Sequence, residues 1–230
     1  MKLLFENWRK FLNEDQASEY KIYCDMDGVL VAFHDGAIAY MNQKLREAGE
    51  RQEELSQLTP DKSNEDYVLW KGARKVAEEL GGFESKIVPM HIEKESGFKH
   101  TRKWMYSLMG GDDSRTEGTP KEDVWANLDW LPEGRKLWES IRGLNPSILS
   151  GPMGTASELG KNTWCMNNLG PEYEVIITPD KGPWGRPSSI LIDDRQKYRD
   201  QFEAAGGITI AHDPNDAMPT IERLKEIMGR

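Results

Sequence analysis

Short apolar runs alternate with longer polar stretches along this 230-residue chain. Each run is rich in Ile, Leu or Val and is bounded by polar or turn-forming residues, a pattern typical of buried β-strands. The runs predict strands near residues 21–25, 147–150, 174–177, 189–193 and 208–211. A polar stretch with helical character follows the fourth run. This alternation of strands with helical stretches indicates an α/β fold.

A long segment separates the first strand from the second. Residues 33–145 are far longer than the crossover helix of a simple βαβ unit, so we expect an inserted domain there. Helical patterns at about 35–48 and 64–80 predict that this insertion is mainly helical. We therefore expect a core formed by residues 20–32 and 146–230, interrupted by the inserted domain at 33–145.

Residues 1–19 are predicted to be an amphipathic helix followed by a linker. Leu4, Trp8, Phe11 and Leu12 fall on one helical face. Interleaved charges and the lack of a small-residue cleavage site argue against a signal peptide. The helix would pack on the domain or on a second copy of the chain, giving a homodimer, or it would dock on a partner or membrane surface. The segment also resembles the openings of proteins from tailed bacteriophages.

The composition of the chain argues against several classes of protein. The net charge of −9 and the lack of a long Lys or Arg run argue against a protein that binds duplex nucleic acid. Two cysteines are too few for a disulfide scaffold, which favours a reducing compartment. No apolar stretch approaches the roughly 20 residues of a membrane-spanning helix. We therefore expect a cytoplasmic protein without a membrane span.

Two acids follow the first strand. Asp25 and Asp27 are one residue apart, and Gly28 lets the backbone turn after them. Both would leave the sheet at its carboxyl edge, where open α/β sheets bind ligands. Crowding two carboxylates there is costly unless a cation or a proton intervenes. The motif therefore indicates a site, although alone it is also consistent with an acidic turn after an edge strand.

The fourth strand ends in a second acid pair, Asp193 and Asp194, followed by Arg195. Mg²⁺ prefers oxygen ligands and usually takes one or two carboxylates together with waters and substrate phosphate. Two acidic strand ends lying side by side would provide such ligands. We expect Asp25, the backbone carbonyl of Asp27 and one of Asp193 and Asp194 to bind Mg²⁺.

The second and third strands end near groups that suit a phosphate. Ser150 offers a hydroxyl, and the backbone N–H groups around Gly151 suit a phosphate oxygen. Lys161 and Lys181 follow these two strands, and either ammonium could neutralise phosphate charge. Each lysine taken alone is more often a solvated surface group.

Together these motifs resemble the haloacid dehalogenase-like phosphatases and, among them, the 5′(3′)-deoxyribonucleotidases. The segments that carry the resemblance are Asp-Met-Asp-Gly-Val-Leu-Val-Ala-Phe from residue 25, Leu-Pro-Glu-Gly from 131, Ser-Gly-Pro from 150 and Ile-Leu-Ile-Asp-Asp-Arg from 190. Residues 34–124 match only loosely. The resemblance implies a Rossmann-like three-layer sandwich with a parallel sheet in the order 3-2-1-4-5 and a helical cap inserted after the first strand.

The resemblance also implies a role for individual residues. Asp25 would be the nucleophile and Asp27 the general acid and base, with Mg²⁺ as the cofactor. The other implied roles are phosphate binding by Ser150, Gly151, Lys161 and Lys181, metal binding by Asp25, Asp27, Asp193 and Asp194, and substrate binding by Phe33, Trp125 and Arg195. Where the family commonly has Thr-Ser-Pro, this chain has Ser-Gly-Pro, which keeps one hydroxyl and lacks the second side chain.

Three functions are consistent with these residues. One is a Mg²⁺-dependent 5′(3′)-nucleotidase that hydrolyses nucleoside monophosphates through an aspartyl-phosphate. Another is the same catalyst acting on a sugar phosphate or other small phosphomonoester, with the cap making the difference. The third is a noncatalytic scaffold or binding module of the same fold. The presence of Asp25, Asp27, Lys161 and the pair Asp193 and Asp194 argues against the third, because a binding module does not need a nucleophile and a proton donor together.

Overall fold

The computed structural model describes residues 20–61, 64–110 and 120–229. The predicted N-terminal helix and linker at residues 1–19 lie outside the described residues. The chain divides into two compact units, which we call the sheet unit and the helical unit. Within the described residues, the sheet unit comprises residues 20–31, Trp130–Gly151 and residues 172–229, and the helical unit comprises residues 32–61, 64–110 and 120–129 together with Pro152–Pro171.

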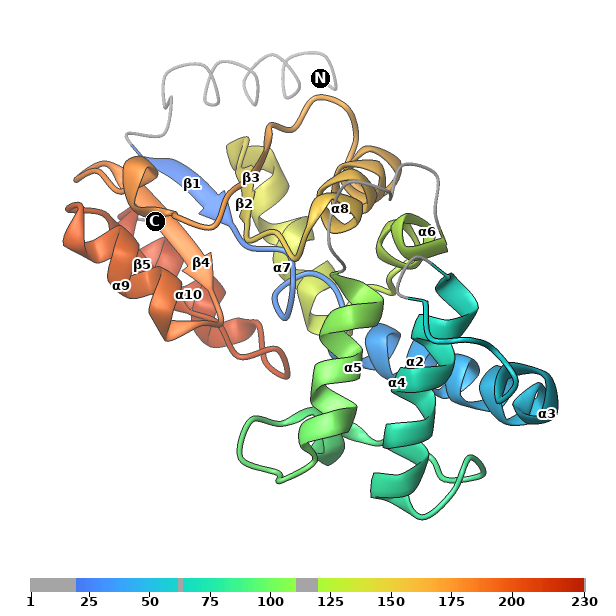
Figure 1. Cartoon of the computed structure of the whole chain (residues 1–230). Helices are drawn as coiled ribbons and strands as arrows, with labels where there is room; N and C mark the ends of the chain where they lie inside the picture. Colours follow the sequence, from blue (N-terminus) through green and yellow to red (C-terminus); the bar gives the residue numbers. More distant parts are fainter. Residues whose placement is uncertain (1–19, 62–63, 111–119, 230) are drawn as a thin grey trace, which may run out of the picture. The chain divides into compact units, whose positions relative to one another are not determined.

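The sheet unit is built on five parallel strands. They are β1 (Lys21–Cys24), β2 (Ser147–Ser150), β3 (Val175–Ile177), β4 (Ser189–Asp193) and β5 (Ile208–Ala211). Their order across the sheet is β3-β2-β1-β4-β5, so β1, first in sequence, lies at the centre between β2 and β4 (Figure 1). In register, Cys24 pairs with Ile148 on one side and with Ile192 on the other. The structure therefore confirms the predicted α/β class, all five strands and their order.

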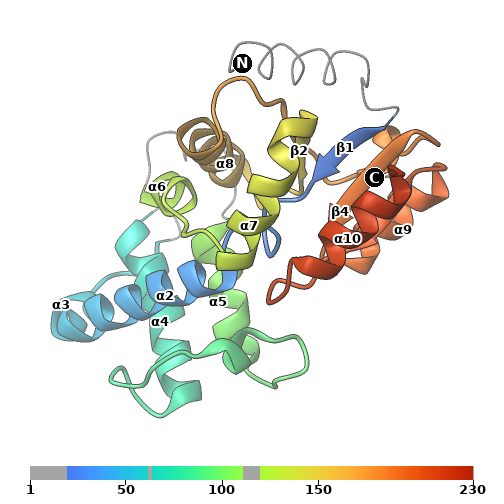
Figure 2. The same cartoon turned by 180° about the vertical axis from the view of Figure 1, so that it is seen from behind.

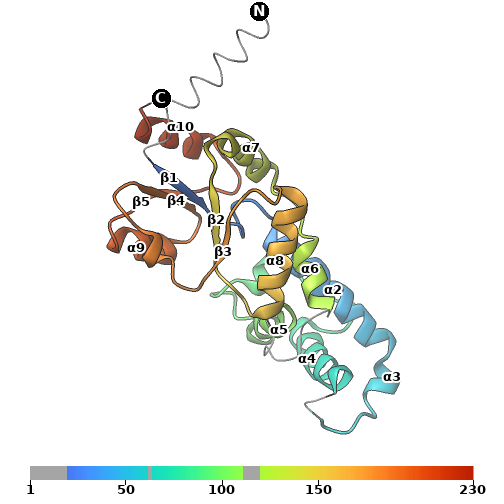
Figure 3. The ribbon, with the colours of Figure 1, turned by 90° about the horizontal axis from the view of Figure 1, so that it is seen from above.

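Helices cover both faces of this sheet. They are α7 (Pro132–Ile141), α9 (Gln196–Ala204) and α10 (Met218–Ile227), with short 3₁₀ turns η3 (Arg142–Leu144) and η4 (Gly182–Trp184). Helices α7 and α10 lie over one face (Figure 2), and α9 lies over the opposite face (Figure 3). On the α9 face, Phe202 packs against Leu149 and Leu191 in a fully buried cluster.

The period-two alternation of strands explains where the acids fall. Tyr23 of β1 and Leu191 of β4 pair in register and pack on the α9 face. Side chains two residues further along a strand return to the same face. Asp25 and Asp193 therefore leave the carboxyl edge of the sheet on the side that α9 covers.

The helical unit consists of α2 (Phe33–Glu50), α3 (Gln52–Leu55), α4 (Glu65–Leu80), η1 (Pro89–Ile92), α5 (Lys99–Met109), α6 (Pro120–Ala126) and α8 (Thr155–Asn168). Helices α2 and α4 coincide closely with the predicted helical patterns. Asn64 caps α4 by accepting a hydrogen bond from the backbone of Tyr67, and Gly81 ends this helix in the left-handed conformation.

Two helices that flank β2 in sequence belong to different units. Helix α7, which precedes β2, belongs to the sheet unit, whereas α8, which follows β2, belongs to the helical unit and packs closely on α6. Packing rather than sequence order thus decides which unit each helix joins. Among the described residues, no helix is both long enough and apolar enough to cross a membrane.

Candidate active site

Asp25 stands at the end of β1, and its backbone extends the sheet by one residue. Its N–H donates to the carbonyl of Ile192 at 2.9 Å, and the residue is 3% exposed. The chain then turns tightly, because the N–H groups of Leu30 and Val31 both donate to the carbonyl of Met26. Backbone hydrogen bonds before and after Asp25 therefore fix the position from which its carboxylate extends.

Gly28 allows this turn to form beside β4. Its φ is +76°, in the left-handed region that favours glycine. A Cβ at this position would lie 2.7 Å from Oδ2 of Asp194, which is closer than real Cβ atoms approach. A glycine here therefore serves both the turn and the close approach of the second acid pair.

Asp193 is held by several hydrogen bonds at the end of β4. Its Oδ1 accepts from the backbone N–H of Arg195 at 2.8 Å. Its backbone carbonyl accepts from Arg199 Nη1 at 2.8 Å and from the backbone N–H of His212 at 3.2 Å. The hydrogen bond to Oδ1 orients the carboxylate, and the two bonds to the carbonyl hold the backbone at the strand end.

Lys181 joins the two strand ends. Its Nζ lies 2.8 Å from Oδ1 of Asp25 and 2.5 Å from Oδ2 of Asp193, and its side chain is 0% exposed. Burial lowers the pKa of this ammonium, but the charges of Asp25 and Asp193 outweigh burial and raise it above the ordinary value. Lys181 is therefore charged, and it bridges the first and fourth strands rather than lying at the margin of the site.

Asp25, Asp193 and Asp194 form an acidic cluster that could hold a metal ion. Each offers a carboxylate oxygen, and these oxygens lie within 4.8 Å of one another. Oδ1 of Asp194 is buried and has no hydrogen-bond partner in the part of the chain that the structure describes. Three carboxylates face one ammonium, so negative charge is in excess. A hard divalent cation such as Mg²⁺ fits this donor set and would satisfy the free oxygen.

The pKa values of the second acid pair reflect the same excess charge. Burial, together with the negative charge of Asp25, raises the pKa of Asp193 to about 6, although Lys181 opposes this shift. Burial and the charges of Asp25 and Asp193 raise the pKa of Asp194 to about 7. Crowding therefore disfavours the ionised forms unless a cation is present.

Asp27 and Arg195 lie at the edge of this cluster. Asp27 is half-buried and forms an isolated bridge with Val31 at the start of the turn. Arg195 is exposed; burial lowers the pKa of its guanidinium, but the charges of Asp194, Asp25 and Asp27 outweigh burial and raise it. The guanidinium thus faces the acidic residues while remaining accessible to solvent.

Ser150 and Gly151 lie at the neighbouring strand end. Ser150 ends β2 and is fully buried, and its carbonyl accepts from the N–H of Thr178 at 2.9 Å. Since β2 pairs with β1, these residues reach the same edge of the sheet as Asp25. The structure thus brings six of the expected polar groups to the carboxyl edge of the sheet unit: Asp25, Asp193, Asp194, Lys181, Ser150 and Gly151.

The remaining three expected residues lie together in the helical unit. The rings of Phe33 and Trp125 stack on each other, with centroids 4.9 Å apart and an interplanar angle of 12°. Nζ of Lys161 lies 5.0 Å from the Trp125 ring centroid, and Nε1 of Trp125 donates to the carbonyl of Met109 at 3.0 Å. Phe33 is 3% exposed, and Trp125 and Lys161 are fully buried. The stacked rings leave no gap between them for a nucleobase.

Sequence reasoning missed the contribution of α9. Arg199 orients Asp193 through its carbonyl, and the ring of Tyr198 lies 4.6 Å from Nζ of Lys181. One feature of the sequence could have indicated this contribution. Residues 195, 198 and 199 have helical spacing and directly follow the acid pair, so they fall together at the start of one helix.

Comparisons with known proteins do not assign the chain to a family. No protein-family model matches the chain, and no curated protein is significantly similar to it. Among solved structures, it is similar to a phosphonoacetaldehyde hydrolase-like protein from Oleispira antarctica, with 12% sequence identity and a TM-score of 0.39. The match covers 84% of this chain and 71% of the other. A similarity of this size carries no functional argument.

Proposed function

We propose that the chain is a Mg²⁺-dependent phosphomonoesterase, and specifically a 5′(3′)-nucleotidase that forms an aspartyl-phosphate on Asp25. One observation carries the proposal. The buried ammonium of Lys181 contacts both Asp25 and Asp193, within an acidic cluster at the carboxyl edge of a parallel sheet. This edge is where open α/β sheets bind ligands. The nucleotidase assignment itself depends on the resemblance of the sequence motifs.

Asp25, Asp193 and Asp194 would hold the metal, with the backbone carbonyl of Asp27 as the further ligand expected from the sequence. When bound, Mg²⁺ would neutralise charge on the phosphoryl oxygens. Lys181 would do the same from the protein side while holding the carboxylate of Asp25 in place. A phosphate monoester is anionic, so both effects lower the barrier to attack by a carboxylate.

The acids of the first motif would divide the chemistry between them. An oxygen of Asp25 forms a bond to phosphorus while the bond from phosphorus to the ester oxygen breaks. Asp27 gives its proton to the departing oxygen. Water then attacks the aspartyl-phosphate, Asp27 accepts a proton from that water, and inorganic phosphate leaves with Asp25 restored. Asp27 thus regains in the second step the proton that it gave up in the first, so the cycle needs no proton exchange with solvent.

The hydroxyl of Ser150 and the backbone at Gly151 would bind the phosphoryl oxygens, and Arg195 would contact the substrate from the exposed rim. The phosphate-binding role of Lys161 follows from the resemblance alone. The chemistry proposed for the sheet unit does not depend on it.

A second candidate is a phosphatase for a sugar phosphate or another small phosphomonoester. The arrangement of Phe33 and Trp125 favours it, because their rings stack on each other and are almost completely buried. A base would have to part this pair, and base stacking on an aromatic side chain contributes only about 1–3 kcal/mol. The chemistry at Asp25 is the same for both candidates.

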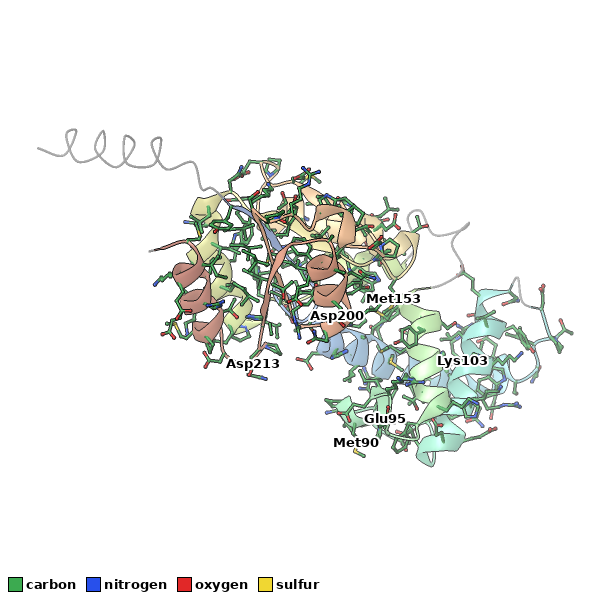
Figure 4. The ribbon with its side chains drawn as sticks, turned by 90° about the vertical axis from the view of Figure 1, so that its left-hand side faces the viewer. Met90, Glu95, Lys103, Met153, Asp200 and Asp213 are labelled. Atoms are coloured by element: carbon green, nitrogen blue, oxygen red, sulfur yellow. The ribbon has the colours of Figure 1, made fainter. Side chains whose placement is uncertain are left out.

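A substrate panel tests the proposal. Purified protein is assayed for phosphate release from nucleoside 5′- and 3′-monophosphates, sugar phosphates and p-nitrophenyl phosphate, with Mg²⁺ and with EDTA. We expect Mg²⁺-dependent turnover that Asp25→Asn abolishes while the protein stays folded, because Asp193 still compensates the charge of Lys181. Asp200→Asn, on the exposed surface of α9 (Figure 4), is the matched control and should retain activity. Lack of turnover by the wild-type protein on the whole panel, or full activity of Asp25→Asn, contradicts the proposal.

A further inference from the structure

The hydroxyl of Tyr198 occupies the place where a side chain at residue 151 would lie. A Cβ built on Gly151 would be 2.5 Å from the Tyr198 hydroxyl oxygen and 3.1 Å from Cζ of the same ring. Contacts below 3.0 Å force a neighbour to move. A side chain at position 151 and the Tyr198 hydroxyl therefore cannot both keep these positions, and the glycine makes room for the tyrosine.

The Tyr198 ring is held at this place by Lys181. Nζ of Lys181 lies 4.6 Å from the ring centroid, within the range of a cation–π interaction. The same ammonium contacts Asp25 at 2.8 Å. One lysine thus fixes both the proposed nucleophile and the aromatic ring whose hydroxyl points at the end of β2.

The hydroxyl is available to a ligand. Within the described residues, the Tyr198 side chain contacts two lysines through its ring, and its hydroxyl donates no hydrogen bond. Burial raises the pKa of the phenol above its ordinary value, so it keeps its proton near neutral pH. The group is therefore a neutral donor beside Gly151, at the edge of the sheet where the phosphoryl group would bind.

We propose that Tyr198 donates a hydrogen bond to the phosphoryl group of the substrate, replacing the hydroxyl side chain that residue 151 lacks. The inference rests on the proposed phosphatase function. It also explains the departure from Thr-Ser-Pro, since the Ser-Gly-Pro sequence at residue 150 supplies one hydroxyl from β2 and α9 supplies the other.

The hydroxyl alone is removed in Tyr198→Phe, which keeps the ring over Lys181. A hydrogen bond to a charged group contributes about 1.5–3 kcal/mol, so we expect kcat/KM for p-nitrophenyl phosphate to fall about tenfold to a hundredfold. Inhibition by inorganic phosphate should weaken in the same variant, with thermal stability unchanged. Tyr173→Phe, which removes a hydroxyl that donates to the Arg142 carbonyl elsewhere in the sheet unit, is the control and should match the wild type.

A double variant separates substrate binding from packing. Gly151→Ser alone should lose activity because the new side chain meets the Tyr198 hydroxyl. In the Tyr198→Ala background, which opens that space, the same Gly151→Ser change should instead increase kcat/KM and phosphate inhibition. The role of Tyr198 is overturned if the wild type is active and Tyr198→Phe has the same kcat/KM, or if kcat/KM of the double variant does not exceed that of Tyr198→Ala. Either result leaves the phosphatase proposal standing. An inactive wild type overturns both.

Discussion

Nζ of Lys181 lies 2.8 Å from Oδ1 of Asp25, and neither side chain is more than 4% exposed. The folded protein depends on such a buried ion pair being intact, because removing one partner leaves the other charge without compensation. Asp193 shares the same ammonium at 2.5 Å. Loss of the lysine would therefore leave two carboxylates facing each other inside the protein.

Lys181→Met removes the charge and keeps most of the side-chain volume. We expect phosphatase activity to be lost and the free energy of unfolding to fall by about 3–5 kcal/mol, because Asp25 and Asp193 are left unpaired. Urea titration measures the loss, and added Mg²⁺ should restore part of it. Lys225→Met, at an exposed position of α10, is the control and should change stability by less than about 0.5 kcal/mol. Equal stability of the two variants would contradict the bridging role.

Mg²⁺ binding should stabilise the folded protein. A ligand that binds only the native state contributes about 2.7 kcal/mol at a concentration 100 times its Kd. We expect the Tm to rise with MgCl₂ relative to EDTA, and the rise to be smaller in Asp194→Asn, which removes one ligand of the acidic cluster. Asp200→Asn should show the full rise. An identical Mg²⁺ response of the wild type and Asp194→Asn would argue against a metal at this cluster.

Gly28→Ala tests the turn after β1. The left-handed backbone costs a non-glycine residue roughly 1–2 kcal/mol, and the methyl group would also press on Asp194. We expect lower thermal stability and a higher Mg²⁺ concentration for half-maximal activity. Gly143→Ala, where a Cβ meets no atom within 4 Å, should leave the Mg²⁺ dependence unchanged. A wild-type Mg²⁺ dependence in Gly28→Ala would show that Asp194 tolerates displacement.

Trp125→Ala tests whether the stacked aromatic pair is packing or a base site. Trp125 is fully buried against Phe33, and its truncation should cost about 3–5 kcal/mol of stability. We expect a lower Tm and a parallel fall in activity on a nucleoside monophosphate and on p-nitrophenyl phosphate. A KM increase confined to the nucleotide, with unchanged Tm, would instead identify Trp125 as a base-binding residue.

Glu79 should make the stability of the helical unit dependent on pH. Its carboxylate accepts hydrogen bonds from the backbone of His100 and Thr101 and from the Thr101 hydroxyl, at the start of α5. Burial raises the pKa of Glu79, but these hydrogen bonds outweigh burial and lower it. A depressed pKa in the folded state stabilises the protein above the unfolded value of about 4.3, and this contribution is lost as pH falls through the folded pKa.

Glu79→Gln measures this contribution. We expect the variant to be less stable than the wild type at pH 7, and the difference in unfolding free energy to shrink below about pH 4 as the wild-type carboxylate is protonated. Glu78→Gln, on the exposed neighbouring position, is the control. A difference that stays constant from pH 7 to pH 3 would contradict the assigned role of Glu79.

The sheet could be predicted from the sequence because its strands are short, apolar and individually bounded. Ile190, Leu191 and Ile192, for example, are all fully buried. A continuous apolar run of this kind is typical of a parallel strand covered on both faces. The proximity of Asp25 to the second acid pair followed from the same reasoning, since parallel strands end at one edge. Membership of α7 and α8 in different units was not predictable, because it depends on packing between distant segments.

The finer geometry of the site lay beyond sequence reasoning for a similar reason. The spacing of Lys181 after β3 says that a cation is available, whereas its double contact with Asp25 and Asp193 depends on how the loop crosses the sheet edge. The mutual stacking of Phe33 and Trp125 joins the start of α2 to α6, over 90 residues later. The fit between Gly151 and Tyr198 likewise joins β2 to α9. None of these pairs leaves a local signal in the sequence.

The central position of β1 also has a consequence for biosynthesis. Within the described part of the chain β1 pairs with β2 and β4 alone, so Tyr23 finds its first partner, Ser147, more than 120 residues later. At a translation rate of roughly 5–20 residues per second, β1 would wait for about 6–25 s before β2 is synthesised. Such distant pairings also slow folding, since the entropy of closing a long loop is lost before any contact is gained. During this interval the nascent chain exposes an apolar strand with both edges free, which is when a chaperone would be most useful to it.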